Sequence, residues 1–171
     1  AQPLLDLKVG ASSDTRTIYT FDSTNTNGNY LKDFNWTNVG GTGYFDDMCS
    51  PTAKLSQCPT LTGPEQTAAS GANLVNYLRG QNGNESTLYR DRDHVLGDMV
   101  TSQPVYVKKP PFEYADAGYS TFRDTTRASR APMVYVAAND GMLHAFYAET
   151  GKINTATGDA VASAGAGVIN M

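Results

Sequence analysis

The chain has 171 residues, enough for one domain with a sizeable core, and its formal net charge at pH 7 is −4. A negative net charge argues against a nucleic-acid-binding domain and against a polybasic membrane-surface module. Charged residues make up 18% of the chain, below the roughly 25% of ordinary soluble domains. Thr, Ser, Asn and Gly supply the polarity instead, and this mix favours turns and strands over helices.

The amino-terminal part is expected to consist of strands and loops. Residues 4–10 are assigned to a first strand, and the alternation within residues 16–21 predicts a second one. Residues 30–36 bring back apolar and aromatic side chains, including the only tryptophan, Trp36, which is expected to pack inside the protein. Residues 40–63 then form a long irregular region, which is either a surface excursion held by cysteines or partly mobile.

The two cysteines, Cys49 and Cys58, lie in this region within a stretch rich in Pro, Ser and Thr. Outside the cytosol, a local disulfide between them is the favoured interpretation. The alternative is two unpaired thiols in a flexible loop. Their spacing does not fit a zinc site, for which only His94 and His144 could complete the four ligands.

A single short helix is predicted for residues 64–79. Thr62 or the glycine after it can cap the helix, and the proline at its start suits the first turn. Gly71 weakens the middle by about 1 kcal/mol relative to alanine. Gly80 is a natural stop after the last turn.

Three carboxylates follow in a strongly charged segment, at Asp91, Asp93 and Asp98. Oxygen-rich spacing can bind calcium, but here Arg90 and Arg92 interleave with the acids and no bidentate glutamate closes a loop. Ion pairs between these arginines and Asp91 or Asp93 are expected instead. Asp98 is expected to cap a turn or to bond a backbone N–H. No cofactor or metal is assigned to this chain.

Residues 103–107 predict a short strand, in which Pro104 belongs at the start or on an edge. Residues 108–130 form a polar connection that carries four aromatic residues: Phe112, Tyr114, Tyr119 and Phe122. Aromatic residues at turns can make a partner-binding surface. The favoured expectation is that these rings fold back over the rim of the sheet.

Residues 133–151 organise the rest of the chain, because they read as strand, turn, strand and turn. Residues 134–136 suit a pleated, half-buried surface, and Asp140-Gly141 is expected to form a two-residue hairpin turn. Residues 143–146 form the return strand. A hairpin is only marginally stable alone, so it must belong to a larger sheet. Units of this kind repeat about every 40 residues in β-propellers.

The residues with side-chain chemistry in this hairpin are interpreted as structural. Asn139 and Asp140 are turn formers first, and His144 is expected to be partly buried and hydrogen-bonded. The chain has no nucleophile elbow, no phosphate-binding glycine loop and no zinc-protease helix. No catalytic residue is therefore assigned, and the chain is expected not to be an enzyme.

Three segments of the sequence, in this order, resemble one family. They are LVNYLRGQ (residues 74–81), YRDRDHVLGDMVTSQPVYV (residues 89–107) and RAPMVYVAANDGMLHAFYAETGK (residues 130–152). They are similar to the entry into the β-propeller of PilC/PilY-type pilus tip proteins, which are large secreted proteins of bacterial type IV pilus systems. RTIYTF and DFNW look similar to the segment that precedes that propeller.

The resemblance implies a mainly β fold, with a partial, truncated propeller-like sheet and one short helix upstream. Residues 1–63 would be a β-rich, loop-rich segment before the propeller. Residues 64–171 would hold the helix and the first blade or blades, as a fragment of a larger protein. The implied function is a non-enzymatic role in pilus assembly and adhesion, with minor pilins or other pilus proteins and a host-cell or abiotic surface as partners. The implied location is secreted, at the cell surface, pilus tip or outer membrane.

The chain also departs from the family. Some relatives carry an Arg-Gly-Asp tripeptide proposed for integrin contact, but residues 79–81 of this chain are Arg-Gly-Gln. The family's calcium loop is not visible in this sequence either. Two other interpretations remain open. One is a fragment of a quinoprotein dehydrogenase, whose blades share the hairpin signature. The other is a filament subunit that assembles through exposed strand edges.

Overall fold

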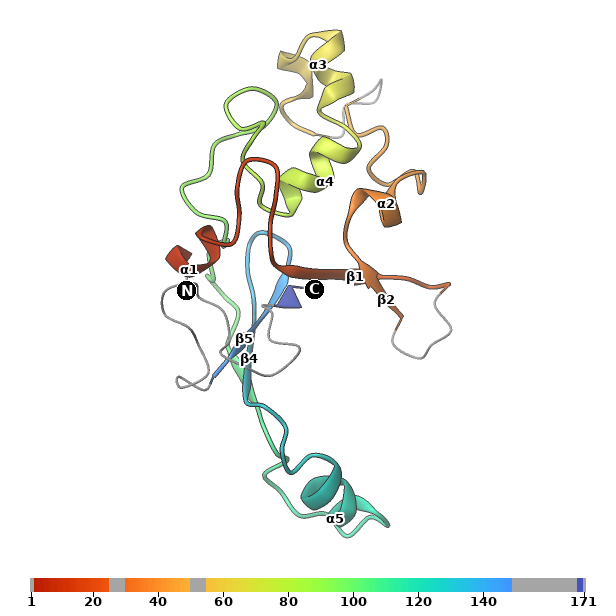
Figure 1. Cartoon of the computed structure of the whole chain (residues 1–171), viewed down its shortest axis with the longest axis vertical. Coiled ribbons are helices and arrows are strands. Elements are labelled where there is room, and N and C mark those ends of the chain that lie inside the picture. The colour runs from red at the N-terminus through yellow and green to blue at the C-terminus, as the bar shows by residue number, and fades with distance from the viewer. Residues whose placement is uncertain (1, 25–29, 50–54, 149–168, 171) are drawn as a thin grey trace. The chain divides into compact units, whose positions relative to one another are not determined.

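Figure 1 shows the computed structural model of the chain, which describes residues 2–24, 30–49, 55–148 and 169–170. The chain forms two compact units, Ala1–Leu96 and Gly97–Met171. The division predicted from the sequence, with residues 1–63 before the propeller and residues 64–171 holding the helix and the first blade or blades, stays a prediction.

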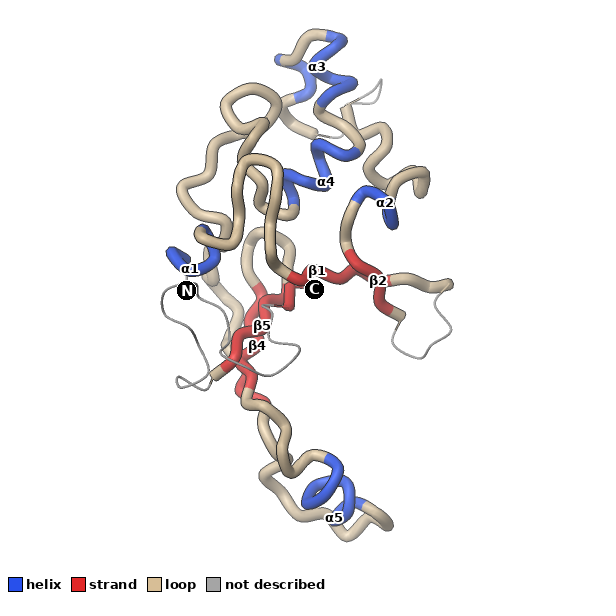
Figure 2. Tube along the Cα trace, in the orientation of Figure 1, coloured by secondary structure: helices blue, strands red, loops and turns tan. Residues whose placement is uncertain are grey.

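The first unit combines short helices with one two-stranded hairpin, as Figure 2 shows by colour. Its elements are α1 (Gln2–Asp6), β1 (Thr17–Phe21), β2 (Leu31–Asp33), α2 (Trp36–Val39), the 3-10 helix η1 (Cys58–Thr60), α3 (Gly63–Ala68) and α4 (Ala72–Leu78). Strands β1 and β2 pair antiparallel, so the strand predicted at residues 16–21 is confirmed. The strand predicted at residues 4–10 is wrong, because the chain starts as a helix that has a proline in its first turn and buries Leu5.

The single predicted helix at residues 64–79 is two helices, α3 and α4. The Glu65 carboxylate accepts hydrogen bonds from the backbone N–H of Thr62 (2.7 Å) and from its hydroxyl (2.6 Å), which fixes the start of α3. Gly71 separates the helices with a φ of 66°, and its N–H donates to the carbonyl of Phe45 (2.7 Å). This tertiary bond and the left-handed backbone explain why the helix does not run through.

Helix α4 carries the centre of the first unit's core. Leu74 belongs to one buried cluster and the adjacent Val75 to another. The members of the first are Cys49, Cys58, Ala69, Leu74, Leu88 and Tyr89, and those of the second are Ile18, Phe34, Val39 and Val75. Trp36 packs against the second cluster, as predicted. A Cβ on Gly40 would lie 2.8 Å from the carbonyl oxygen of Trp36, so only glycine fits there.

The second unit is built on an antiparallel sheet. Its strands are β3 (Val105–Val107), β4 (Met133–Ala137), β5 (Leu143–Tyr147) and β6 (Ile169–Asn170), and its short helices are α5 (Tyr119–Thr121) and the π-helix η2 (Phe122–Thr126). Hydrogen bonding joins β3 to β4, β4 to β5 and β5 to β6. The predicted strand at residues 103–107 and the predicted hairpin are confirmed. Pro104 lies immediately before β3, where it disturbs no ladder.

The turn of the hairpin differs from the prediction. The expected two-residue turn is a three-residue loop, because Ala137 still pairs with Leu143 and the N–H of Ala138 donates to the carbonyl of Met142 (3.1 Å). Gly141 alone takes a left-handed backbone, with a φ of 82°, and its N–H donates to the carbonyl of Ala138 (3.1 Å). This is the tight turn followed by a left-handed glycine that three-residue hairpins use.

Candidate functional site

The hairpin loop of the second unit holds a carboxylate–imidazole pair. His144 on β5 is completely buried, and its Nε2 lies 2.8 Å from Oδ2 of Asp140. The same Oδ2 accepts a hydrogen bond from the N–H of Gly97 (3.0 Å), and Oδ1 accepts one from the N–H of Met142 (3.0 Å). We call Gly97, Asp140 and His144 the hairpin lock, because one carboxylate joins the loop, strand β5 and the start of the unit.

The surroundings of the hairpin lock leave little room for change. A Cβ on Gly97 would lie 2.5 Å from the backbone nitrogen of Asp140, and the N–H of Asn139 donates to the carbonyl of Asp98 (2.9 Å). Burial alone would raise the pKa of Asp140. Hydrogen bonds from His144, Gly97 and Met142 outweigh it and hold that pKa below its ordinary value. The carboxylate therefore stays ionised at neutral pH and acts as a structural acceptor.

Residues 79–81 are held inside the first unit. The guanidinium of Arg79 binds the carboxylate of Asp14 through Nε–Oδ2 (2.9 Å) and Nη2–Oδ1 (2.8 Å), and it also donates to the carbonyl of Phe34. The side chain of Asp14 is only 1% exposed, and Nε2 of Gln81 donates to it as well (3.2 Å). The tripeptide is thus part of the core and does not offer a loop to a receptor.

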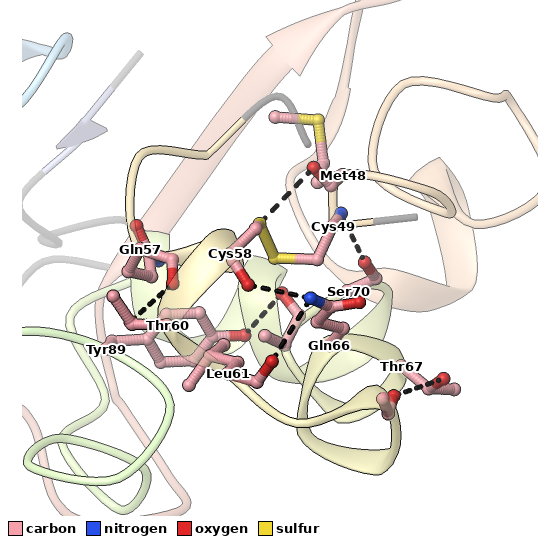
Figure 3. The surroundings of a disulfide bond; sticks show 12 residues. Met48, Cys49, Gln57, Cys58, Thr60, Leu61, Gln66, Thr67, Ser70 and Tyr89 are labelled. Atoms are coloured by element: carbon pink, nitrogen blue, oxygen red, sulfur yellow. Dashed lines mark hydrogen bonds between the residues drawn. A yellow bond between two sulfur atoms is a disulfide. The ribbon is translucent and has the colours of Figure 1, made fainter. Parts of the chain in front are cut away.

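Figure 3 shows the disulfide between Cys49 and Cys58, which are nine positions apart in the sequence. Both cysteines are buried in the first core cluster. The N–H of Cys49 donates to the hydroxyl of Ser70 (3.1 Å), and Nε2 of Gln66 donates to the carbonyl of Cys58 (2.8 Å). The bond therefore ties the irregular region to α3 and to the residues that follow it.

A stack of flat side chains adjoins the first core cluster, to which Tyr89 belongs. The rings of Tyr77 and Tyr89 lie 4.4 Å apart between centroids, and the guanidinium of Arg92 lies 3.9 Å from the Tyr77 centroid. Burial first, and then the neighbouring Tyr77, raises the pKa of Tyr89. Nε of Arg92 pairs with Oε1 of Glu85 at 2.6 Å. This stack is structural, since its faces are occupied by protein.

The carboxylates singled out in the sequence do not converge on one point. Asp91 accepts a hydrogen bond from the hydroxyl of Ser86 (2.6 Å), and the partner of Arg92 is Glu85. Within the described residues, neither Arg90 nor Arg92 forms the expected ion pair with Asp91 or Asp93, so that prediction is wrong. Within the part of the chain that the structure describes, no three His, Cys, Asp or Glu side chains come together to hold a metal ion.

Residues 108–130, which connect β3 to β4, form what we call the aromatic lobe. Neighbouring rings contact one another in series, with centroid distances of 6.4 Å for Phe112 and Tyr114, 5.0 Å for Tyr114 and Tyr119, and 6.1 Å for Tyr119 and Phe122. Phe112 is 65% exposed and Tyr114 is 57% exposed. The expectation that these rings fold back over the rim of the sheet is not met in this chain. Figure 1 shows the lobe, with α5, beyond the ends of β3 and β4.

Ion pairs hold the aromatic lobe together. Arg123 binds Glu113 (2.6 Å) and Asp124 (2.8 Å), and Lys109 binds the second oxygen of Asp124 (2.7 Å). Hydrogen bonds from Arg123 and Lys109 lower the pKa of Asp124. The guanidinium of Arg127 lies 5.5 Å from the ring centroid of Phe122. The lobe is therefore a small body with its own contacts, although its rings stay open to solvent.

Two small pockets of the first unit are lined by described residues. One has a volume of about 90 Å³ and is lined by amide side chains that include Asn76 and Asn84. Another, of about 100 Å³, is lined by Asp6, His94 and Arg92 among others. Sites for cofactors and drug-sized ligands have volumes of roughly 300–1,000 Å³. Neither pocket is large enough for such a ligand.

Comparisons with known proteins agree on one family. The family model described as the PilY1 beta-propeller domain matches residues 96–157, which contain the hairpin lock. The type IV pilus biogenesis factor PilY1 of Pseudomonas aeruginosa (strain UCBPP-PA14) is 35% identical over 160 residues, which is 88% of this chain and 12% of that protein. A PilY1 homolog of Xylella fastidiosa is 46% identical over 101 residues, 53% of this chain and 8% of that protein.

The chain spans about a tenth of the length of these curated relatives. No solved structure matches it significantly. Among the described residues, every helix is too short or too polar to cross a bilayer.

Proposed function

Because this chain belongs to the PilY1-type proteins of type IV pilus systems, we propose that it supplies the entry into their β-propeller and acts as a non-enzymatic binding module. The observation that carries this proposal is the match of residues 96–157 to the PilY1 propeller. That segment contains strands β3, β4 and β5 with the hairpin lock, and we interpret it as the opening blade of the larger propeller. Within the pilus system, we propose that this module contributes to pilus assembly and to adhesion.

The geometry supports binding over catalysis. The imidazole of His144 is completely buried and its partner Asp140 accepts from three protein donors, so this pair is not open to a substrate. The two pockets described for the first unit are several times smaller than a ligand site. A protein of this kind works through surfaces that contact other proteins.

The proposed partners are minor pilins or other pilus proteins, with a host-cell or abiotic surface as a second contact. The proposed location is outside the cell, at the cell surface, the pilus tip or the outer membrane. The names of the relatives support a role in pilus biogenesis. Contact with an integrin through residues 79–81 is not proposed, because Arg79 and Gln81 bind Asp14 inside the unit.

The test is genetic. Deleting the gene from its bacterium should remove most pili from the cell surface and reduce attachment to cells and plastic, and the intact gene should restore both. Normal pilus numbers in the deletion strain would contradict a role in assembly. Normal attachment at restored pilus levels in a strain lacking this module would contradict the adhesive role.

A biochemical measurement tests the non-enzymatic assignment. The purified protein is mixed with pyrroloquinoline quinone and calcium and assayed for dye reduction with alcohols and sugars. We expect no turnover above the protein-free control. Turnover that disappears on removal of the quinone would contradict the proposal and favour a quinoprotein.

A further inference from the structure

Strand β3 of the second unit has apolar side chains that are open to solvent on both of its faces. Val105 is 57% exposed and Tyr106 is 58% exposed. Consecutive residues of a strand point to opposite faces of the sheet, so these two side chains cannot be covered by one neighbour. Among the described residues, β3 pairs only with β4, which leaves its outer edge open as well.

A sheet that is buried on both faces is recognised by strands with continuous apolar runs. Strand β3 reads Val-Tyr-Val, and β4 reads Met-Val-Tyr-Val-Ala. A sheet with one wet face would alternate apolar and polar residues instead. The continuous apolar runs of β3 and β4 therefore indicate a sheet that is covered by other layers on both faces.

The aromatic lobe continues this apolar surface along the chain. Val107, the last residue of β3, leads directly into the lobe, where Phe112, Tyr114 and Phe122 are 65%, 57% and 37% exposed. Arg123 forms ion pairs with Glu113 and Asp124 inside the lobe. These contacts give the lobe a defined fold while Phe112 and Tyr114 stay exposed, and exposed apolar rings of this kind are a feature of docking surfaces.

We propose that β3 and the aromatic lobe are an internal docking surface, covered in the complete protein by other blades of the same propeller. The length of the relatives supports this occupant, because the chain spans only 8–12% of them and a propeller needs several blades packed around one axis. A blade lies between two neighbours, which accounts for the uncovered apolar residues on both faces of β3. The lobe would pack on the same neighbours.

This inference rests on the propeller assignment and is independent of the proposed partners. Its test is hydroxyl-radical labelling of Tyr106, Phe112 and Tyr114, read by mass spectrometry, in this chain and in the full-length protein. We expect the three side chains to be labelled in this chain. In the full-length protein, labelling should fall about fivefold, as exposure drops from nearly 60% to the level of buried residues.

Tyr44 is the internal control, because it is 74% exposed and lies in the first unit. Its labelling should be the same in both proteins. Labelling of Tyr106, Phe112 and Tyr114 that is equally strong in both would overturn the proposal. Protection that already develops in this chain on raising its concentration would identify a second copy as the occupant and would also overturn it.

A second measurement uses stability. The substitutions Y106S and Y114S should lower the thermal midpoint of the full-length protein by several degrees and leave that of this chain within about 1 °C. Y44S should change neither protein. Equal midpoints for Y106S, Y114S and unchanged full-length protein would overturn the proposal.

Discussion

The two units of this chain treat their apolar residues differently. The first unit closes two clusters around α4, with Leu74 and Val75 buried side by side. The second unit buries Met133 and Val136 but leaves Val105 and Tyr106 more than half exposed. The first unit also has exposed rings, such as Phe21 and Tyr44, but both apolar clusters found among the described residues are buried in it. The difference indicates that the first unit has a core of its own, whereas the second unit is one layer of a larger body.

The largest effect is expected for the ion pair buried in the first unit. D14A leaves the guanidinium of Arg79 buried without its carboxylate, which should cost about 3–5 kcal/mol of unfolding free energy. Urea unfolding followed by the fluorescence of Trp36 measures the loss. The control D33A removes an exposed carboxylate of β2 and should change little. A loss below about 1 kcal/mol for D14A would contradict the buried role of residues 79–81.

The disulfide comes next, and it belongs to the first unit alone. Replacing Cys49 and Cys58 together by serine releases the loop and should cost about 3 kcal/mol, by the loop-entropy estimate for a loop of this length. Hydrogen exchange should rise around α3 and stay unchanged in β4 and β5. An equal rise in both units would mean that their stabilities are linked, against the comparison made above.

The hairpin lock is the corresponding feature of the second unit. D140A leaves two backbone N–H groups and the imidazole of His144 without their acceptor, at a cost of about 2–3 kcal/mol. We expect hydrogen exchange to become faster in β4 and β5, and its rate in α4 to stay unchanged. D98A is the control, because Asp98 contributes its backbone carbonyl to the loop. Exchange in β4 and β5 that is as slow in D140A as in the unchanged chain would contradict a stabilising role of the hairpin lock.

Acid should weaken the same lock in a defined direction. The pKa of Asp140 is lowered in the folded state, so its contribution is present above the unfolded value of about 4. That contribution is lost as the pH falls through the lower folded pKa. Unfolding curves between pH 6 and pH 2 should show this loss in the native chain and a smaller loss in D140N. Identical pH profiles would contradict it.

The smallest effect is expected at the stack beside α4. R92K keeps the charge but loses the flat contact with Tyr77 and the directed bond to Glu85, which should cost about 1 kcal/mol. R90K is the matched control on an exposed neighbour. A larger loss in R90K than in R92K would show that the stack does not stabilise the first unit.

The features predicted from the sequence are those that local pattern determines. Residues 134–136 and 143–146 were recognisable as paired strands because their side chains suit a sheet and a glycine marks the turn. Thr62 was recognisable as a possible cap of the helix, and in the structure Glu65 completes a capping box with it. Gly71 marks the weak point of the predicted helix, but a complete break could not be predicted there, because it depends also on a hydrogen bond to Phe45 in a different part of the chain.

The missed features depend on partners far apart in sequence. Asp140 looked like a turn residue, and its bond to Gly97 joins positions 43 residues apart. Arg79 and Asp14 are 65 residues apart, and no local pattern marks Asp14 as the partner of Arg79. The start of the chain was misassigned because Leu4-Leu5-Asp6-Leu7 fits a strand and a helix about equally well.

We conclude that the first unit has a buried core of its own and that the second unit is one layer of a PilY1-type propeller. Amide hydrogen exchange of this chain and of the full-length protein tests it most directly. We predict that α4 and β1 exchange at the same rate in both proteins, while β3 and β4 become at least tenfold slower in the full-length protein. Equal rates for β3 and β4 in the two proteins would contradict the claim.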